Sequence, residues 1–245
     1  MTDHEAGDHE AGVAVLVLTL NEALRIGPLL DALRTGGFNE IVVCDGGSTD
    51  GTDAMAASTP GVRLVRSGRG RGAGINAAAR ASRSPIIIIL HADTLLPPRA
   101  AQIAEETLID PLVVAGCFRL RFDARSLLLD GYAWLTRFDS GLTTFGDQAY
   151  FIRRTAFEAA GGAPDWPLLE DVALRTRLRR LGRFVKLREQ VVTSARRFVR
   201  RGSLRGQVRN AMVLAGYHLG VPIRLLAAFY EKGLSNDVAS DRAET

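Results

Sequence analysis

Acidic residues at three points of the chain follow apolar runs or glycine-rich loops, where a carboxylate could act on a bound ligand. The first is Asp45, which ends the apolar run Ile41–Val43 and opens the segment Asp45-Gly46-Gly47-Ser48-Thr49-Asp50-Gly51-Thr52. Adjacent glycines let a backbone come close to a ligand, and the polar residues after them can cap the next helix. This pattern predicts a strand that ends in a ligand-binding loop. A solvent turn rich in turn-forming residues is the alternative.

The second point is His91-Ala92-Asp93, which follows the apolar run Ile86–Leu90. Open parallel sheets bind ligands outside the carboxyl ends of their strands, so we expect Asp45 and Asp93 to converge at one edge. One carboxylate near a nucleotide base and one near its diphosphate would suit a sugar nucleotide, because a metal held by a carboxylate can bridge phosphates. His91 is a further candidate metal ligand. A capped helix start before Pro97 accounts for the same residues equally well.

The third point is the pair Glu170-Asp171 at the head of a predicted helix, after the loop Gly161–Pro164. A carboxylate on such a loop could act as general base towards an incoming hydroxyl group. Acids at a helix N-terminus also occur as simple complements of the helix dipole, and this alternative stays open. The triplet Gly146-Asp147-Gln148, just before a predicted strand, is a further candidate for lining a site.

Apolar periodicity indicates the elements that must position these residues. Strand–helix units in succession predict an α/β fold, with a mostly parallel sheet covered by helices on both faces. The predicted strands are Val13–Thr19, Glu40–Cys44, Val62–Val65, Ile86–Leu90, Val113–Phe122, Ala149–Arg153, Phe184–Leu187 and Val191–Thr193. The predicted helices are one opened by Asn21 and Glu22, then Thr52–Ala57, Ala73–Ala81, Arg99–Thr107, Leu127–Phe138, Glu170–Leu181, Leu204–Leu219 and Ile223–Tyr230.

The 245 residues suit one α/β domain with a helical appendage. Residues 1–12 repeat Asp-His-Glu-Ala-Gly, which predicts a disordered tail, then a domain over 13–232 with C-terminal helices from about 202, and a flexible tail over 233–245. Cys44 and Cys117 lie in apolar runs, which predicts buried, reduced thiols and a cytoplasmic protein. No apolar run approaches the length of a membrane span, and the first residues lack the pattern of a secretory signal.

Positive charge is concentrated towards the C-terminus. Between Arg175 and Lys232 there are fifteen lysine and arginine residues against two acids, Glu189 and Glu231. Such a segment could meet an anionic lipid surface, a diphosphate or a nucleic acid. No base-stacking or groove-reading motif accompanies it, so no nucleic acid partner is expected. Peripheral contact with an anionic membrane, at the inner face, is one expectation, and helices that simply cover the sheet are the other.

Taken in order, the motifs resemble a known family. The set Thr19-Leu20-Asn21-Glu22, Asp45 to Thr52, His91-Ala92-Asp93 and Glu170-Asp171 resembles the family-2 inverting glycosyltransferases of GT-A fold. More narrowly, Arg69-Gly70-Arg71, Asn76, Gly146-Asp147-Gln148 and the run Thr193 to Phe198 resemble a small bacterial branch, the arsenosugar-biosynthesis or radical-SAM/selenodomain-associated glycosyltransferases. Each motif is short, and their order along the chain is the more specific signal.

The resemblance implies metal-dependent, non-processive transfer from a nucleotide-diphosphate sugar, most often a UDP-sugar in this family, to a hydroxyl acceptor with inversion. Mn²⁺ or Mg²⁺ would be the cofactor, held by Asp93. Asp171, with Glu170 beside it, would deprotonate the acceptor, and Gly146, Asp147 and Gln148 would contact the acceptor. The residues implied around the donor are Thr19, Asn21, Glu22, Asp45, Gly46, Arg69, Arg71, Asn76, His91, Ala92, Asp93, Arg196 and Arg197.

Two departures from the family pattern narrow this interpretation. The usual Asp-x-Asp is His91-x-Asp93 here, which leaves the first position open to a ribose or a metal role. A Gln-x-x-Arg-Trp motif, typical of processive members, is replaced by Arg196-Arg197-Phe198, which argues against polymer synthesis. Those arginines could still offer forked donors to a diphosphate.

Two other classes of function fit parts of the chain. Gly68-Arg69-Gly70-Arg71-Gly72-Ala73 matches a dinucleotide fingerprint, with Asp93 near the expected distance downstream, as in an NAD(P)-dependent oxidoreductase. Against this, the fingerprint belongs on the first strand–helix turn and here follows the third predicted strand. A non-catalytic module that binds membrane surfaces is the other class, and it would leave Asp45, Asp93 and Asp171 without a role.

Overall fold

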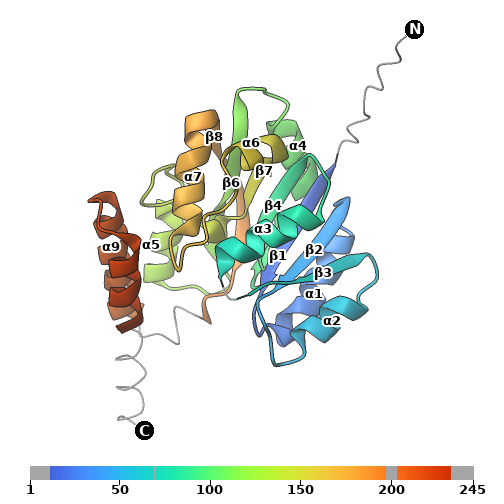
Figure 1. Cartoon of the computed structure of the whole chain (residues 1–245), viewed down its shortest axis with the longest axis horizontal. Helices are drawn as coiled ribbons and strands as arrows, with labels where there is room; N and C mark the ends of the chain where they lie inside the picture. Colours follow the sequence, from blue (N-terminus) through green and yellow to red (C-terminus); the bar gives the residue numbers. More distant parts are fainter. Residues whose placement is uncertain (1–11, 69, 197–202, 233–245) are drawn as a thin grey trace.

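The computed structural model describes residues 12–68, 70–196 and 203–232. Most of the two predicted tails, together with Arg69 and Arg197, lie outside the described residues. The described chain is built on one eight-stranded sheet in the order β3-β2-β1-β4-β7-β6-β8-β5 (Figure 1). The predicted α/β architecture with a mostly parallel sheet is confirmed.

The first half of the sheet forms because its strands are short apolar runs rich in valine and isoleucine, which suit burial on both faces. Its strands are β1 (Val13–Thr19), β2 (Glu40–Asp45), β3 (Val62–Arg66) and β4 (Ile86–His91). β1 pairs in parallel with both β2 and β4, and β2 pairs in parallel with β3. The helices between and after these strands are α1 (Ala23–Arg34), α2 (Thr52–Ser58), α3 (Arg71–Ala81) and α4 (Ala100–Thr107). These elements agree with the predicted ones to within two residues at each end.

The second half of the sheet mixes directions. β7 (Tyr150–Arg153) runs antiparallel to β4, and β6 (Val113–Phe122) runs antiparallel to β7. β8 (Arg183–Thr193) is parallel to β6, and the short β5 (Thr94–Leu95) closes the far edge antiparallel to β8. The sequence predicted two strands where β8 is one, because three exposed polar residues, 188–190, interrupt its apolar pattern. The strand continues through them, and its pairing with β6 shifts register there.

Alternating residues of the central strands feed two separate cores, as expected for a sheet buried on both sides. Val13, Val15 and Val17 pack with buried residues of α1 and α4 on one face. Ala14, Leu16 and Leu18 pack with α3, α6 (Arg154–Ala159) and α7 (Glu170–Leu181) on the other. Cys44 and Cys117 lie in this second core as free, buried cysteines, as predicted. The helices on both faces fix the strand ends that carry the polar motifs.

A third group of elements lies beyond the second half of the sheet. It comprises α5 (Leu127–Leu135), the 3₁₀ turn η1 (Gly146–Gln148), α9 (Ser203–His218) and a helix over 223–232. Val213 of α9 and Leu226 pack against Leu168, in the segment that leads into α7. Figure 1 shows α9 at one side of the molecule, next to α5 and α7. Among the described residues, no helix is long and apolar enough to cross a membrane.

Gly72 makes the closest contact between α3 and the loop before α7. A Cβ built at this residue would lie 2.0 Å from the carbonyl oxygen of Pro164, so we expect Gly72→Ala to lower the free energy of unfolding by about 1–3 kcal/mol. Gly131 of α5 is the matched control, because a Cβ there would meet nothing within 4 Å. Gly131→Ala should be neutral or stabilising by up to about 1 kcal/mol. Urea unfolding of both variants measures this, and equal stabilities would contradict it.

Candidate functional site

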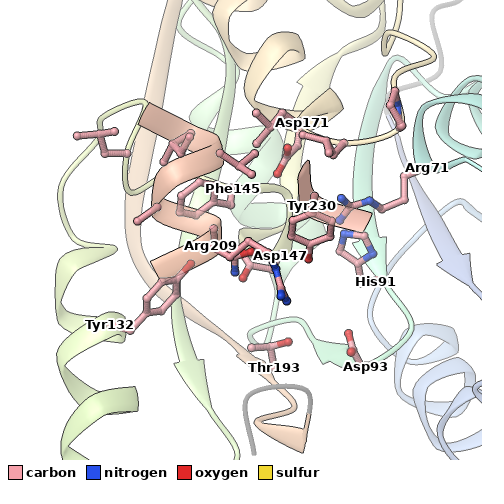
Figure 2. Close-up of a pocket in the computed structure, with 18 of the residues that line it drawn as sticks. Arg71, His91, Asp93, Tyr132, Phe145, Asp147, Asp171, Thr193, Arg209 and Tyr230 are labelled. Atoms are coloured by element: carbon pink, nitrogen blue, oxygen red, sulfur yellow. The ribbon is translucent and has the colours of Figure 1, made fainter. Parts of the chain in front are cut away.

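A cavity of about 440 Å³ opens beyond the carboxyl end of β4, between the loop before α7, α5 and α9. Strands, loops and C-terminal helices all contribute to its wall. It is lined by Arg71, His91, Asp93, Tyr132, Leu142, Phe145, Asp147, Pro167, Leu168, Leu169, Asp171, Thr193, Ser194, Arg209, Asn210, Ala211, Val213, Leu214 and Tyr230. Figure 2 shows the side chains that surround this pocket.

Three carboxylates from separate elements line the pocket: Asp93 after β4, Asp147 in η1 and Asp171 in the first turn of α7. The backbone N–H of Gly146 donates to Oδ2 of Asp171 at 2.6 Å, and that of Val172 donates to Oδ1 at 2.8 Å. A Cβ on Gly146 would lie 3.1 Å from the Cβ of Asp171, so a glycine lets η1 approach the helix this closely. These bonds fix the Asp171 carboxylate while leaving it at the pocket surface.

Asp147 is the carboxyl group whose environment most disfavours charge. Burial, together with the negative charges of Asp171 and Asp93, raises its pKa from the ordinary 3.8 to about 7, against the lowering effect of Arg71 and Lys186. Its Oδ1 is buried and has no hydrogen-bond partner among the described residues. The pocket therefore gathers more acidic groups than it can keep ionised without an added cation.

Glu170 has a different position from its neighbour. It is only 2% exposed, and it does not line the pocket. Its Oε1 lies 2.7 Å from Nε of Arg71 at the head of α3. Burial raises the pKa of Glu170 to about 7, against the lowering effect of Arg71. Glu170 thus holds Arg71 in place, whereas Asp171 is the member of the pair that a ligand can reach.

Two loops at the ends of β1 and β2 are tied together by their own polar side chains. Ser48 Oγ accepts from the N–H of Asn21 at 2.9 Å, and Asn21 Oδ1 accepts from the N–H of Thr49 at 2.9 Å. Asp50 and Thr52 accept from the N–H groups of Ala23 and Glu22 at 3.0 and 2.8 Å. Asn21 has a positive φ of 55°, which asparagine tolerates better than most residues. The two predicted ligand loops are therefore one connected unit.

Asp45 and Asp93 share an edge of the sheet but not a pocket. β1 lies between β2 and β4, so the two strands are about 9.5 Å apart at two strand spacings. Asp45 is 2% exposed and does not line the cavity. Its Oδ2 accepts from the N–H groups of Gly47 and Ser48 at 3.0 and 2.9 Å. Both carboxylates thus lie at the expected edge of the sheet, separated by the end of β1, and only Asp93 lines the cavity.

Arg196 connects the two regions. Its Nη2 donates to Glu22 Oε1 and lies 3.9 Å from Oδ2 of Asp93. Glu22 is 4% exposed, so a buried acid, a pocket acid and one guanidinium form a linked set between the ends of β1 and β4. An anion such as a diphosphate placed here would meet this guanidinium directly.

Several other predicted site residues support the pocket from behind it. Both atoms of the Asn76 amide bond to the backbone of Ala163, at 2.8 and 3.0 Å, which fixes the loop before α7. The Gln148 amide is buried and donates to the carbonyl of Thr143 at 2.7 Å. Ala92 and Thr19 are buried at their strand ends, and Thr19 Oγ1 has no hydrogen-bond partner in the described part of the chain. Gly46 lies at the end of β2, its N–H bonded to the Thr19 carbonyl at 3.0 Å.

Sequence reasoning missed the wall formed by Tyr132, Phe145, Arg209 and Tyr230. Arg209 is 8% exposed, and its guanidinium lies 5.1 Å from the centre of the Tyr230 ring. Figure 2 shows both side chains at the pocket, with Tyr230 drawn beside His91 in this view. The signal available in the sequence was an arginine, Arg209, between the apolar residues Val208 and Met212 of a predicted helix.

The donor atoms in the pocket suit a divalent metal that is coordinated partly by the protein and partly by phosphate oxygens of a substrate. Among the described residues, no group of three or more His, Cys, Asp or Glu side chains could enclose an ion. Asp93 and His91 do lie together at the pocket wall, and Mg²⁺ commonly binds through one or two carboxylates plus substrate phosphates. The excess of acidic groups around Asp147 gives a cation a further electrostatic reason to bind.

Many of the C-terminal basic residues are engaged within the protein. Asp139 accepts from Arg175 Nη2 and Arg179 Nη1, both at 2.5 Å. Arg183 pairs with Asp110 at 2.9 Å, while Arg196 and Arg209 face the site. Part of the positive charge of this segment is therefore used in contacts within the protein.

Comparisons with known proteins agree with this geometry. A model of the family described as glycosyl transferase family 2 matches residues 14–157. Glycosyltransferase AglJ of Haloferax volcanii is 35% identical over 82 residues, which are 33% of this chain and 27% of AglJ. The chain thus spans about a quarter of the length of that curated relative.

Two solved structures share the fold. The mannosyltransferase PcManGT of Pyrobaculum calidifontis, in complex with GDP-Man and Mn²⁺, superposes with a TM-score of 0.58 at 23% identity, covering 95% of this chain and 75% of that one. Glucosyl-3-phosphoglycerate synthase of Mycobacterium tuberculosis, with Mn²⁺, UDP and glucosyl-3-phosphoglycerate, gives a TM-score of 0.59 at 20% identity, covering 87% and 81%.

The raised pKa of Asp147 should make stability depend on pH. Between the ordinary pKa of 3.8 and about 7 the folded protein keeps a proton that the unfolded chain has lost, so stability should fall as pH rises through this window. Asp147→Asn cannot ionise and should gain about 1–2 kcal/mol over the parent from pH 5 to pH 8, in EDTA. Thermal melts across this range measure the difference. Asp130→Asn, on the surface of α5, is the control, and parallel curves for parent and Asp147→Asn would refute the assignment.

Proposed function

The chain belongs to glycosyl transferase family 2, and on this basis we propose that it transfers one sugar from a nucleotide-diphosphate sugar to a hydroxyl acceptor in a metal-dependent single displacement. The observation that carries the proposal is the placement of Asp171 and Asp93 in the wall of one cavity, on separate elements. One carboxylate can then serve the acceptor while the other serves the diphosphate.

Asp171 is the proposed general base. Its two backbone hydrogen bonds hold the carboxylate in a fixed orientation, which is what proton transfer to a positioned group requires. The acceptor hydroxyl would lose its proton to Asp171 as its oxygen attacks the anomeric carbon. Glu170 acts on Arg71 rather than on the acceptor, so we assign it a positioning role. With one base and no second nucleophile assigned, the product should have inverted configuration.

The donor would bind along the ends of β1, β2 and β4. Thr19, Asn21, Glu22 and Asp45, on the connected loops, would receive the nucleotide, with the buried Oγ1 of Thr19 as an available hydrogen-bonding atom. Arg71, beside Glu170, and Arg196, beside Asp93, would bind the diphosphate. Asp93, with His91 beside it, would hold Mn²⁺ or Mg²⁺, and the ion would stabilise the negative charge of the leaving diphosphate.

The acceptor would enter from the side of α5 and α9. Asp147 stands between the carboxylates of Asp93 and Asp171, where a sugar or acceptor hydroxyl could hydrogen-bond to it. The enclosed wall of Tyr132, Phe145 and Tyr230 favours transfer of a single residue over extrusion of a polymer. We further propose a UDP-sugar donor, membership of the arsenosugar-associated branch, one catalytic domain over 13–232 and a cytoplasmic location.

The oxidoreductase alternative has lost its basis. The glycine-rich segment 68–73 follows β3, an edge strand of the sheet, and not the first strand β1, where a dinucleotide fingerprint belongs. Family membership extends across this segment. The two arginines of the segment suit the phosphates of a sugar nucleotide instead.

Metal-dependent donor binding tests the proposal directly. A panel of nucleotide sugars with Mn²⁺ should stabilise the protein by about 2.7 kcal/mol when the true donor is present at a hundred times its dissociation constant. Asp93→Asn should lose most of that gain because it removes the anionic metal ligand. Differential scanning fluorimetry measures both, with Asp53→Asn as a surface control. A variant that still binds Mn²⁺ and donor like the parent would rule out the role of Asp93.

Turnover should separate the two acids at the head of α7. Asp171→Asn should lower kcat by about 10² to 10⁴ with donor affinity little changed, because proton transfer is lost. Glu170→Gln should weaken donor binding more than it lowers kcat at saturation, because Arg71 loses its anchor. Steady-state kinetics and NMR of the product anomer measure this. An active Asp171→Asn with an inactive Glu170→Gln would exchange the roles, and a retained anomer would exclude single displacement.

A further inference from the structure

Helix α5 is apolar but lies at the surface. Its sequence, Leu127-Leu128-Leu129-Asp130-Gly131-Tyr132-Ala133-Trp134-Leu135, contains one charged residue, and only Leu129 is buried. In a water-soluble protein a helix of this composition normally packs into a core. The structure leaves most of its apolar surface uncovered, so an additional contact is needed to explain it.

The exposed residues of α5 form one stripe. At 100° per residue, Leu127, Gly131, Trp134, Leu135 and Leu128 occupy a continuous arc, and the spacing i, i+4, i+7, i+8 is that of a core-facing stripe. Here it points to solvent: Leu127 is 95% exposed, Leu128 48%, Trp134 50% and Leu135 46%. Phe138 and Leu142, just beyond the helix, are 49% and 59% exposed. We call these six side chains, Leu127, Leu128, Trp134, Leu135, Phe138 and Leu142, the α5 face.

The α5 face borders the mouth of the pocket. Tyr132, on the inner side of the same helix, lines the cavity, and Leu142 belongs to both the face and the lining. Figure 2 shows Tyr132 on α5 at the edge of the pocket. A group bound against the α5 face would therefore lie directly beside the acceptor side of the site.

Arginines outnumber acids around the α5 face, where one exposed acid, Asp123, accepts a hydrogen bond from the N–H of Ala195 at 2.8 Å. Arg121, Arg125 and Arg137 are exposed, and the guanidinium of Arg137 lies 4.8 Å from the centre of the Trp134 ring. The nearby acids are engaged: Asp130 pairs with Arg125 at 3.2 Å, and Asp139 binds the two arginines of α7. Leucine and tryptophan flanked by arginine is the composition of helices that lie in the interface of an anionic bilayer.

We propose that the α5 face docks on an anionic phospholipid bilayer and that the acceptor is an amphiphile presented there. Its hydroxyl would reach Asp171 past Tyr132 and Leu142, while its apolar part stays with the bilayer. The contact is peripheral, since no described helix could span a membrane. Charge complementarity selects lipid over a second copy of this basic protein, which would bring like charges together. Docking on the bilayer does not depend on the proposed function, whereas the identity of the acceptor rests on it.

Vesicle co-sedimentation of the full chain tests the docking. The parent should bind vesicles of phosphatidylcholine and phosphatidylglycerol in equal parts far better than phosphatidylcholine alone. Binding should weaken in high salt without vanishing, because screening removes only the electrostatic part. A triple variant, Leu127→Gln with Leu128→Gln and Leu135→Gln, should lower binding about tenfold or more through lost apolar contact. With Trp166→Phe in both proteins, Trp134 is the one remaining tryptophan, and its emission should shift to shorter wavelength on vesicles without the three α5 substitutions and not with them.

The control replaces three exposed apolar residues elsewhere, Leu24→Gln with Ile109→Gln and Leu112→Gln, which are 90%, 78% and 65% exposed in the parent. It should bind vesicles like the parent, and both triple variants should keep the parent melting temperature. The docking is overturned if the parent ignores anionic vesicles at low salt, or if both triple variants bind equally. It is also overturned if light scattering shows that the α5 variant only breaks a dimer. A parent that binds vesicles through α5 but no nucleotide sugar would instead remove the proposed function.

Discussion

Several carboxyl groups are held close together at one end of the sheet, and the arrangement around them is set by the need to offset their charges. Asp93, Asp147 and Asp171 line one cavity, and Glu170 lies buried behind it. Burial and the neighbouring negative charges raise the pKa of Asp147 and of Glu170, and charged groups cost free energy when buried without partners. Arg71 and Arg196 supply part of the compensation from opposite sides. The remaining negative charge of these carboxyl groups would favour binding of a metal ion in the pocket.

Arg71 and Arg196 also connect separate elements of the fold through their ion pairs. Arg71 joins the head of α3 to the head of α7 through Glu170, and Gly72 beside it packs against the Pro164 carbonyl. Arg196 joins the end of β8 to the ends of β1 and β4 through Glu22 and Asp93. Donor loops and acceptor residues are thus coupled by ion pairs rather than by continuous secondary structure. Binding a diphosphate at these guanidinium groups would alter both couplings at once.

The C-terminal helices complete the site instead of extending away from it. α9 contributes Arg209, and the following helix contributes Tyr230, so the cavity is closed on the side that the sheet leaves open. Packing of Val213 and Leu226 against Leu168 fixes this wall to the segment that carries Asp171. The outward apolar stripe of α5 lies on the same side. The end of the pocket proposed for the acceptor is therefore bordered by uncovered apolar surface.

The sequence by itself determined the elements of the first half of the sheet, the family and the acids that we propose to carry the chemistry. This was possible because β-branched runs, glycine-rich loops and acidic strand ends are local signals, each readable within ten residues. Strand order and side-chain direction are not local. β7 lies antiparallel between β4 and β6. No local sequence pattern predicts this position, because strand pairing depends on packing between residues far apart in the sequence.

The difference between local sequence signals and long-range packing also determines which residues line the pocket. Asp45 and Asp93 have equivalent sequence settings, yet β1 between their strands leaves only Asp93 in the pocket. Glu170 and Asp171 are adjacent in sequence, but successive helical residues point about 100° apart, so one faces Arg71 and the other the cavity. Tertiary structure also brought Arg209 and Tyr230 to the wall from the far end of the chain. Sequence thus determines which groups are present, and three-dimensional packing decides which of them a ligand can meet.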